Sequence, residues 1–214
     1  RWANFDDVYK TIDKNFMESV WWAFSELYKK DMIYRSYKVT AYSYKLQSPL
    51  SNFEASQNYK EIDTRSIYVR FKLCDEDNTF IVAWTTTPWT LPSNIALCVN
   101  SDLEYDYVQD ENDNVYIIGK NKYKNCNIKI KKVLKTVKGS DLIGMRYEPL
   151  YDYFVSDKYH YIICDKYVQD SGTTGTDVVH IAPFFGEDDY RVCKEQNIIT
   201  DEDIVDLEIG RAHV

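Results

Sequence analysis

The sequence has little proline and glycine, few histidines and no long apolar run: five prolines, seven glycines and three histidines in 214 residues. The longest apolar runs, such as residues 80–84, are far shorter than the roughly 20 residues that a membrane-spanning helix needs. No charged-then-apolar leader opens the sequence. We therefore expect a soluble, cytoplasmic globule with no membrane partner.

The five cysteines lie far apart, at positions 74, 98, 126, 164 and 193. This spacing excludes a Cys-x-x-Cys metal knuckle and gives no sign of a dense disulfide framework. We interpret them as reduced structural cysteines and expect no metal and no cofactor.

Positive charge is also in deficit, with a net charge of −8 and an isoelectric point near 5.0. That balance argues against a protein that holds nucleic acid over its whole surface. Residues 120–138 are the exception, because they hold eight lysines and no acid. This lysine stripe predicts either an exposed edge strand protected from aggregation or a local phosphate-contacting surface.

The hydrophobic pattern predicts many short strands and few helices. An amphipathic helix is expected over residues 15–30 and a second over 188–197, whereas residues 35–46 alternate like a strand and 48–54 resemble a connector. The remaining strands are expected at 66–73, 79–85, 94–100, 114–119, 127–133, 159–164 and 177–182. We predict a β-rich α/β fold, barrel-like, with minor helices and an N-terminal flanking helix.

Two stretches concentrate polar groups that carry chemistry. WTTTPWTLPSN, residues 84–94, places threonine hydroxyls where proline ends a strand. GTTGTDVVHIAPFFGEDDYRVC, residues 172–193, places His180 near the acids 187–189 across a turn. The plain alternatives are ordinary strand threonines, a structural histidine and helix-capping acids.

Taken together, the two stretches resemble the editing domain of isoleucyl-tRNA synthetases, in its eukaryotic cytoplasmic form. RWANFDD, FMESVWWAFSELY and SPLSNFEASQNYK extend the resemblance over nearly the whole chain, to about residue 200. TTTPWT at 85–90 favours the isoleucyl branch over the valyl and leucyl enzymes, which carry TTRP. Neither HIGH nor KMSKS occurs, so we expect a fragment without the aminoacylation site.

The resemblance implies three parts. Residues 1–40 would flank the insertion as part of the catalytic domain, 41–200 would form the editing domain, and 201–214 would be an acidic tail with an expression scar. The implied partners are the acceptor end of tRNA(Ile) and the rest of the synthetase.

The resemblance also implies hydrolysis of mischarged Val-tRNA(Ile), and of valyl-adenylate, by positioned water. Asp189 would bind the substrate's α-ammonium group, and His180 would measure its side chain. The other implied residues are Thr85, Thr86 and Thr87 for water and the acyl-adenosine end, and Trp84, Trp89, Gly175 and Thr176 for substrate binding. Independently of the resemblance, the phosphate-contacting interpretation of the lysine stripe predicts that Lys129, Lys131 and Lys132 bind tRNA.

One position departs from the pattern, because Asp177 stands where the family usually has the second glycine of GTGVVH. If that position needs a positive φ, aspartate strains the loop, and its charge would repel a nearby phosphate. The alternative function is therefore a non-catalytic tRNA-binding insert that keeps the fold and has lost hydrolysis.

Overall fold

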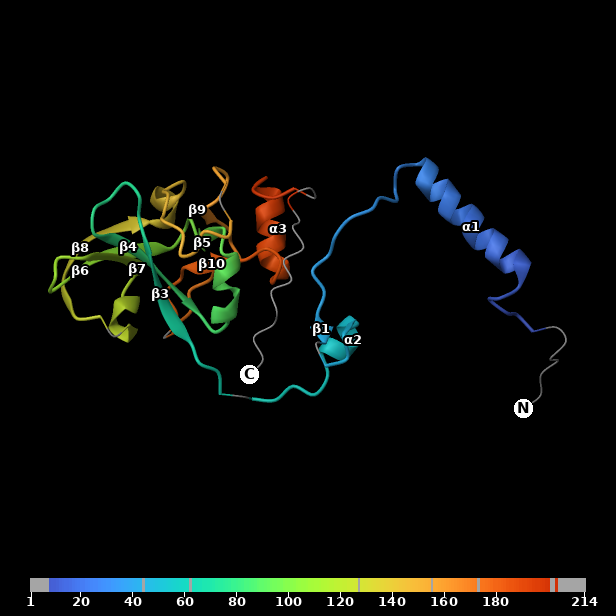
Figure 1. Cartoon of the computed structure of the whole chain (residues 1–214), viewed down its shortest axis with the longest axis horizontal. Helices are drawn as coiled ribbons and strands as arrows, with labels where there is room; N and C mark the ends of the chain where they lie inside the picture. Colours follow the sequence, from blue (N-terminus) through green and yellow to red (C-terminus); the bar gives the residue numbers. More distant parts are fainter. Residues whose placement is uncertain are drawn as a thin grey trace. The chain divides into compact units, whose positions relative to one another are not determined.

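The structure is a computed structural model that describes residues 8–43, 45–61, 63–126, 128–154, 156–172, 174–200 and 203 (Figure 1). The chain divides into two compact units, residues 1–37 and 38–214. The predicted roles of the three segments stay predictions, and the tail lies outside the described residues except for Asp203.

The first unit contains one helix, α1 (Lys14–Lys29), at the predicted place. Its last turn carries Lys29, whose charge suits the negative end of the helix dipole. No residue of α1 is buried within this unit. Within residues 8–37 its aromatic face is covered only in part: the Tyr9 ring packs edge-to-face against Phe16, with ring centroids 5.3 Å apart.

For the described residues of the strand predicted over 35–46, the prediction is wrong except at two positions; residue 44 lies outside the described residues. Only β1 (Tyr42–Ser43) forms, paired with β2 (Ser48–Pro49). An alternating pattern makes a strand only where a neighbour satisfies its backbone N–H and C=O groups. The expected connector holds a short helix, α2 (Asn52–Ala55), which Ser51 and Glu54 begin with a capping box.

The larger of two further sheets has five strands in the order β3-β4-β7-β6-β8. They are β3 (Ile67–Lys72), β4 (Thr79–Thr85), β6 (Glu104–Asp110), β7 (Val115–Gly119) and β8 (Ile130–Lys138). Strands β4 and β7 run parallel and the other pairs antiparallel. The lysine stripe ends in the edge strand β8, as the first of its two interpretations predicts, while β6 was not predicted at all.

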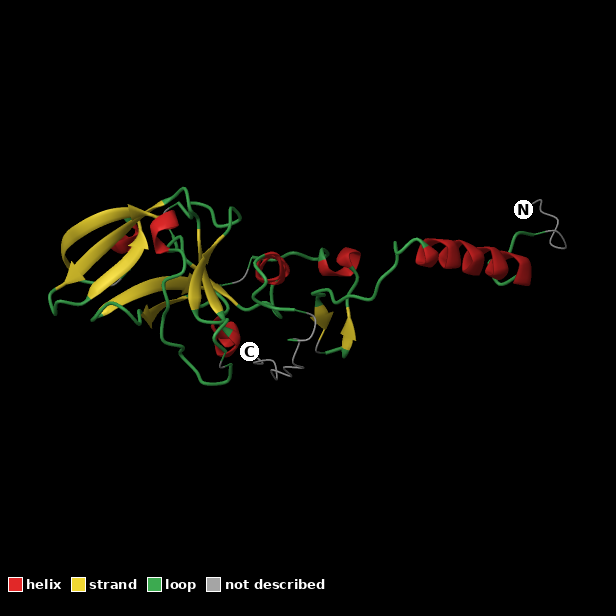
Figure 2. Cartoon of the chain, turned by 90° about the horizontal axis from the view of Figure 1, so that it is seen from above, coloured by secondary structure: helices red, strands yellow, loops and turns green. Residues whose placement is uncertain are grey.

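The smaller sheet has the order β10-β5-β9. It consists of β5 (Ala96–Val99), β9 (Tyr161–Cys164) and β10 (Val179–Ile181). Isolated bridges from Leu73 to Tyr147 and from Arg146 to Tyr161 connect the two sheets. The result is the predicted β-rich, barrel-like arrangement, although β3 and β8 remain edges, so the described strands form no closed barrel (Figure 2).

The two sheets pack face to face over the main core. Phe71 and Ile81 of the larger sheet and Leu97 and Ile162 of the smaller one are fully buried there. Helix α3 (Glu187–Glu195), predicted at 188–197, covers the other face of the smaller sheet through residues such as Val192 (Figure 1). This packing fixes the start of α3 near the end of β10.

Strand β4 is buried on both faces. Ile81 and Ala83 face the main core, whereas Val82 belongs to a separate apolar cluster with Val108 and Ile118. Burial on both faces explains why this strand is a continuous apolar run instead of an alternating one. Its carboxyl end, where the threonines begin, is thereby held firmly in place.

All five cysteines are free, as predicted, and those at 98, 126 and 193 are buried. None of the described helices is long and apolar enough to cross a membrane.

Candidate functional site

The two predicted stretches meet at one cavity of about 250 Å³. The cavity opens where β4 ends, between the short 3-10 helix η1 (Pro88–Ser93), strand β10 and the start of α3. Its lining residues are Trp84, Thr85, Thr87, Thr90, Val179, His180, Ala182, Phe185, Gly186 and Asp189. Five of the residues predicted from sequence are therefore brought together: Trp84, Thr85, Thr87, His180 and Asp189.

Thr85 and Thr87 form a local hydroxyl pair at the end of β4. The Thr85 Oγ1 accepts a hydrogen bond of 3.0 Å from the Thr87 N–H, and the two hydroxyl oxygens lie 3.2 Å apart. Thr85 is buried and Thr87 is exposed. The pair therefore presents hydroxyl groups in fixed positions between the interior and the mouth of the cavity.

His180 is buried and contacts Thr90, a residue that the sequence analysis did not select. The Thr90 hydroxyl donates to the Thr87 carbonyl oxygen at 2.8 Å, and the His180 Nε2 lies 3.0 Å from the same hydroxyl. Because the Thr90 hydrogen is already used, Nε2 must be the donor and His180 is the Nε2–H tautomer. Burial lowers the pKa of His180 to about 4, so the ring is neutral at pH 7.

The Nδ1 atom of His180 is buried without a hydrogen-bond partner in the described structure. In the Nε2–H tautomer this atom carries only a lone pair. His180 is thus a neutral, shape-defining wall of the cavity and is poorly suited to act as a base at acidic pH.

Asp189 lies in the first turn of α3, with its carboxylate directed at the end of β10. Its Oδ2 accepts a hydrogen bond of 2.9 Å from the Ala182 N–H, and the Tyr167 hydroxyl lies 3.5 Å from Oδ1. Burial raises the pKa of Asp189 to about 6, and the neighbouring charge of Asp188 adds to the rise. The carboxylate is therefore ionised at neutral pH, with no cation paired to it among the described contacts.

Tyr167 is a contact that sequence reasoning missed, because no motif links it to α3. The other two acids of the segment point elsewhere. Glu187 and Asp188 are exposed at the start of the helix, and Asp188 forms an ion pair of 3.4 Å with Arg191. They satisfy the expectation that some of the acids only favour the helix N-terminus.

Four residues predicted for this site do not line the cavity: Thr86, Trp89, Gly175 and Thr176. Trp89 is on the surface, 42% exposed. Thr176 is 1% exposed, and its hydroxyl donates to the Val178 carbonyl oxygen at 3.3 Å, so a direct role in substrate binding does not fit its position.

Gly175 lies behind the cavity. It has a φ of 80°, and a side chain placed on it would meet the Ser171 hydroxyl at 2.7 Å and the Trp84 ring at 3.7 Å. Only glycine fits this position without strain. The absence of a side chain at Gly175 therefore leaves the space beside Ser171 and Trp84 free.

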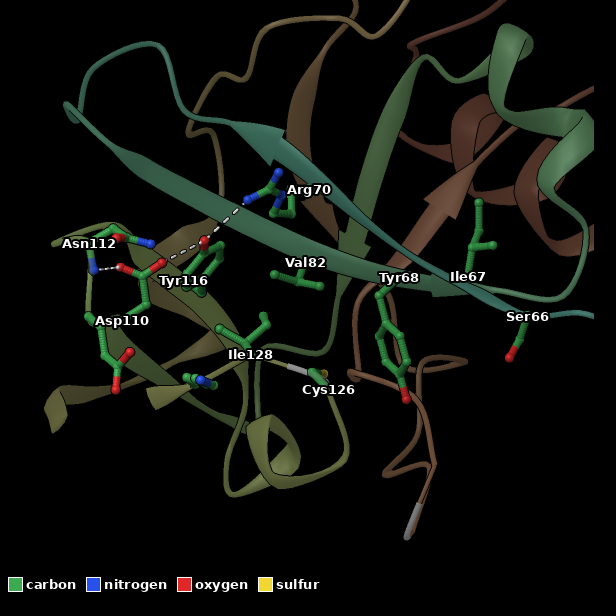
Figure 3. A pocket seen from close by; sticks show the side chains of 12 residues that line it. Ser66, Ile67, Tyr68, Arg70, Val82, Asp110, Asn112, Tyr116, Cys126 and Ile128 are labelled. Carbon is green, nitrogen blue, oxygen red and sulfur yellow. Dashed lines mark hydrogen bonds between the residues drawn. The ribbon is translucent and has the colours of Figure 1, made fainter. Parts of the chain in front are cut away.

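The predicted tRNA-binding lysines Lys129, Lys131 and Lys132 are exposed on or just before β8. Lys131 forms a loose ion pair of 3.7 Å with Asp113. Lys129 also lines a second, larger cavity of about 690 Å³, which opens on the five-stranded sheet beside Arg70 and Tyr116 (Figure 3). That cavity shares no lining residue with the one that holds the predicted site.

Over the described part of the chain, no group of three or more histidine, cysteine or carboxylate side chains could hold a metal ion. The polar groups available to the cavity are hydroxyls, one neutral imidazole and one carboxylate. Such a set can orient water and bind a cation.

Known proteins similar to this chain agree with the motifs. The cytoplasmic isoleucine–tRNA ligase of Saccharomyces cerevisiae is 44% identical over 96% of this chain and 20% of its own length. The probable cytoplasmic isoleucine–tRNA ligase of Dictyostelium discoideum is 46% identical over 94% and 19%. The chain thus spans about a fifth of the length of these relatives.

Among solved structures, the crystal structure of GlLeuRS-CP1 shares the fold at a TM-score of 0.52. It is 17% identical and covers 61% of this chain and 60% of that chain. The family model of the class I tRNA synthetases (I, L, M and V) matches residues 1–195. Because that match covers most of the sequence, the chain belongs to the class I tRNA synthetases of this group.

Proposed function

We propose that this chain is the editing domain of a cytoplasmic isoleucyl-tRNA synthetase and hydrolyses the ester of mischarged Val-tRNA(Ile). The observation that carries the proposal is the meeting of Thr85, Thr87, His180 and Asp189 at one cavity. The relatives named as cytoplasmic isoleucine–tRNA ligases support the choice of amino acid and of compartment.

A chemical reason for such a site exists in this family. One methylene contributes only about 1 to 3 kcal/mol to discrimination in an apolar pocket, a limit for which isoleucyl-tRNA synthetase is the usual example. A second, smaller site that destroys valyl products solves this problem. The same site would accept valyl-adenylate, which presents the same valyl group.

Asp189 supplies the recognition of the amino acid. Its carboxylate is ionised at pH 7, partly desolvated and without a cationic partner among its described contacts. An α-ammonium group placed in the cavity completes a charge-assisted pair. The hydrogen bond from the Ala182 N–H fixes the orientation of the carboxylate for this contact.

The threonine hydroxyls position the attacking water. Thr85 accepts from the Thr87 backbone and shares a hydrogen bond with the Thr87 hydroxyl, so both oxygens are held in one orientation. A water bound to them stands beside an ester whose ammonium end is held by Asp189. Orientation of this kind contributes a large share of the rate of such hydrolyses. A ribose hydroxyl of the tRNA is a further group for proton transfer in this proposal.

His180 supplies the size limit. The Thr90 hydroxyl holds its ring in one orientation, and its neutral state keeps that wall of the cavity free of charge. The extra methylene of isoleucine would then clash with the His180 ring, which the Thr90 hydroxyl keeps from rotating. Val-tRNA(Ile) would be hydrolysed and Ile-tRNA(Ile) spared.

The proposal is tested by the rate at which the 214-residue chain releases valine from Val-tRNA(Ile). Ile-tRNA(Ile) serves as the second substrate, and a sample without protein gives the spontaneous rate. Asp189→Asn is the matched variant, because the amide keeps an oxygen that accepts from the Ala182 N–H. We expect selective release of valine by the parent and none above the spontaneous rate by the variant.

Two outcomes would contradict the proposal. Equal release from both substrates would remove the size limit. A folded chain that binds tRNA(Ile) without releasing valine would identify a tRNA-binding insert that has lost hydrolysis.

A further inference from the structure

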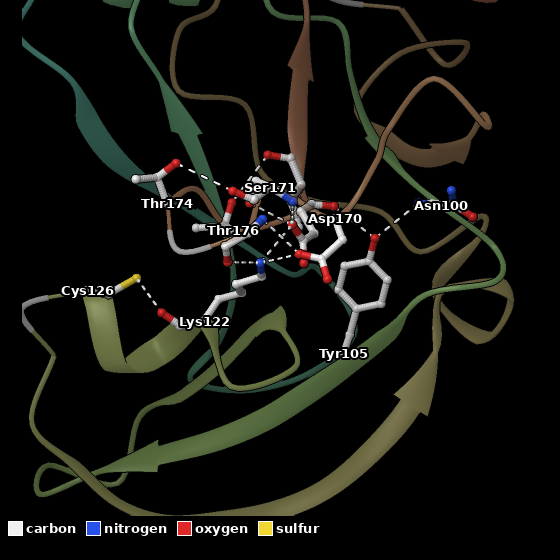
Figure 4. Close-up of polar contacts among 11 residues, drawn as sticks. Asn100, Tyr105, Lys122, Cys126, Asp170, Ser171, Thr174 and Thr176 are labelled. Carbon is white, nitrogen blue, oxygen red and sulfur yellow. Dashed lines mark hydrogen bonds and ion pairs between the residues drawn. The ribbon is translucent and has the colours of Figure 1, made fainter.

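Lys122 belongs to the lysine stripe by sequence, yet its side chain lies inside the protein. The residue begins the 3-10 helix η2 (Lys122–Asn125) and is 6% exposed. Its ammonium Nζ lies 2.5 Å from Asp170 Oδ1 and 3.7 Å from Asp177 Oδ1, and it also donates to the Gly172 carbonyl oxygen (Figure 4). Lys122 thus contacts both ends of the segment whose described residues are 170–172 and 174–177, which we call the 170–177 loop.

Asp177 closes this loop with its carboxylate. Its Oδ1 accepts hydrogen bonds from the Ser171 N–H at 2.9 Å and from the Ser171 hydroxyl at 2.7 Å. The residue has a φ of 56°, so the position does require the left-handed conformation that its place in the sequence suggested. Aspartate adopts that conformation more readily than most residues, and the Lys122 ammonium offsets its buried charge.

The closed loop is attached to the larger sheet at two points. The Tyr105 hydroxyl donates to the Asp177 carbonyl oxygen at 2.8 Å, and the Gly119 N–H donates to the Thr176 carbonyl oxygen at 2.8 Å. A side chain at Gly119 would meet the Asp177 carboxylate at 2.4 Å. The Lys122–Asp177 pair is therefore held against the larger sheet, beside a cavity of about 280 Å³ that both residues line.

The loop approaches the proposed catalytic cavity at Gly175. A Cβ atom placed on Gly175 would lie 2.7 Å from the hydroxyl of Ser171, which binds Asp177, and 3.7 Å from the Trp84 ring. Trp84 lines the cavity together with Thr85 and Asp189. A shift of the loop would therefore move the wall that Trp84 forms.

We propose that Lys122 and Asp177 form a positioning pair for the proposed deacylation: their buried ion pair holds the 170–177 loop closed and so fixes Trp84 against the substrate. The effect on deacylation depends on the proposed function, whereas the ion pair itself is seen in the structure. It assigns Lys122 to the interior of the domain and not to an RNA surface. It also assigns Asp177 a role in which its charge is met by a cation.

The test compares Lys122→Met with Lys120→Met in the 214-residue chain. Lys120 is the matched control, because it is exposed and pairs with the exposed Glu104 at 2.7 Å. For Lys122→Met we expect the KM for Val-tRNA(Ile) to rise roughly tenfold with kcat nearly unchanged, because the loop positions substrate and touches no reacting atom. Lys120→Met should match the parent in both constants.

A rescue experiment separates positioning from a general loss of structure. In Lys122→Met/Asp177→Asn the uncompensated charge is gone, and the asparagine oxygen still accepts from the Ser171 N–H while tolerating the positive φ. We expect this double variant to recover most of the parental KM. A Lys122→Met protein with parental KM, or a defect that Asp177→Asn does not relieve, would overturn the proposal.

A second readout keeps the pair testable if the parent releases no valine. Amide hydrogen exchange reports the Ser171 N–H and the Gly119 N–H, which bond to the Asp177 carboxylate and to the Thr176 carbonyl oxygen. Faster exchange at both in Lys122→Met than in Lys120→Met, restored in the double variant, would support the pair even though the proposed reaction had failed. Equal exchange in all three variants would overturn the pair itself.

Discussion

The Asp189 carboxylate is the one cavity group that titrates near neutral pH. Its pKa is raised to about 6 by burial, whereas His180 is held neutral by a pKa lowered to about 4. If the ionised carboxylate binds the α-ammonium group, kcat/KM for deacylation should fall about tenfold per pH unit below pH 6. The measurement is kcat/KM for Val-tRNA(Ile) from pH 5 to pH 8, after the spontaneous hydrolysis at each pH is subtracted.

In Asp189→Asn the fall of kcat/KM below pH 6 should disappear, and kcat/KM should be low and independent of pH in this range. If the fall below pH 6 persists in the variant, another group titrates there, and the result would argue against a contact between Asp189 and the α-ammonium group. His180 should not change kcat/KM between pH 5 and pH 8, because its pKa lies below that range.

The same carboxylate should lower the stability of the fold. Its folded pKa, about 6, exceeds the ordinary value of 3.8, so the folded state binds the proton more tightly than the unfolded state does. Stability from this group is therefore complete below about pH 4 and is lost as the pH rises through 6. At pH 7.5 we expect Asp189→Asn to gain on the order of 1 to 2 kcal/mol, after partial exposure is discounted.

Urea unfolding of parent and Asp189→Asn at pH 4 and pH 7.5 measures that gain. The advantage of the variant should be present only at the higher pH. A variant that is less stable at both values would make Asp189 chiefly a structural link between α3 and β10.

At His180 the size of the side chain should decide selectivity. His180→Ala removes a wall of the cavity and the donor to Thr90, so we expect Ile-tRNA(Ile) to be hydrolysed along with Val-tRNA(Ile). Thr90→Val separates the two effects, because it removes the hydrogen bond that orients the His180 ring and keeps the ring itself. Rates for both substrates with each variant give the result, and unchanged selectivity in His180→Ala would contradict a size-measuring role.

At the scale of elements, strand β8 carries the predicted tRNA contacts. We expect weaker binding of tRNA(Ile), and a smaller dependence of the affinity on salt, in the triple variant Lys129→Gln/Lys131→Gln/Lys132→Gln. Fewer phosphate contacts release fewer counterions when the tRNA binds. The control is Lys38→Gln/Lys72→Gln/Lys158→Gln, which removes the same charge from exposed lysines elsewhere. Dissociation constants at several salt concentrations measure the slope, and equal slopes for the two triple variants would exclude β8 as the RNA surface.

The elements also show what could be predicted from sequence. Strands with apolar residues on both faces, such as β4 and β5, were placed well, because both of their faces are buried. Strand β6, EYDYVQD, was missed because its buried residues mix tyrosines, one valine and two aspartates, so no apolar run or clean apolar alternation marks it. Residues 35–46 alternate as well, but only 42 and 43 pair with a neighbouring strand.

For the candidate site, the motifs predicted which segments meet, and the structure determines which side chains reach the cavity. Thr90 and Tyr167 contact His180 and Asp189, yet neither contact is visible in local spacing. Thr176 and Lys122 carry polar groups that suggest binding, but tertiary packing turns both inward. Burial of a polar residue depends on partners distant in sequence, such as Asp170 for Lys122, and a local pattern does not contain them.

At the scale of the whole molecule, all of the buried core lies in the second unit. The fully buried side chains of the three apolar clusters come from residues 71–199, and α1 contributes none of them. We therefore expect residues 38–214 alone to melt within about 3 °C of the full chain, since the deletion removes none of the side chains of these three clusters. Thermal unfolding of the two proteins at equal concentration measures this, and a drop of more than 10 °C would show that the first unit supports the second.

The first unit should instead govern association. Trp21 is 69% exposed and Trp22 is 68% exposed, and Phe24 and Leu27 are also accessible on the same helix. Apolar surface of this kind promotes contacts between molecules unless another part of a longer protein covers it. Sedimentation of the full chain should therefore show self-association that rises with concentration, whereas residues 38–214 should remain monomeric. If both proteins sediment as monomers over the same range, the exposed face of α1 is too small to drive association, and its aromatic residues contribute only to the local stability of the helix.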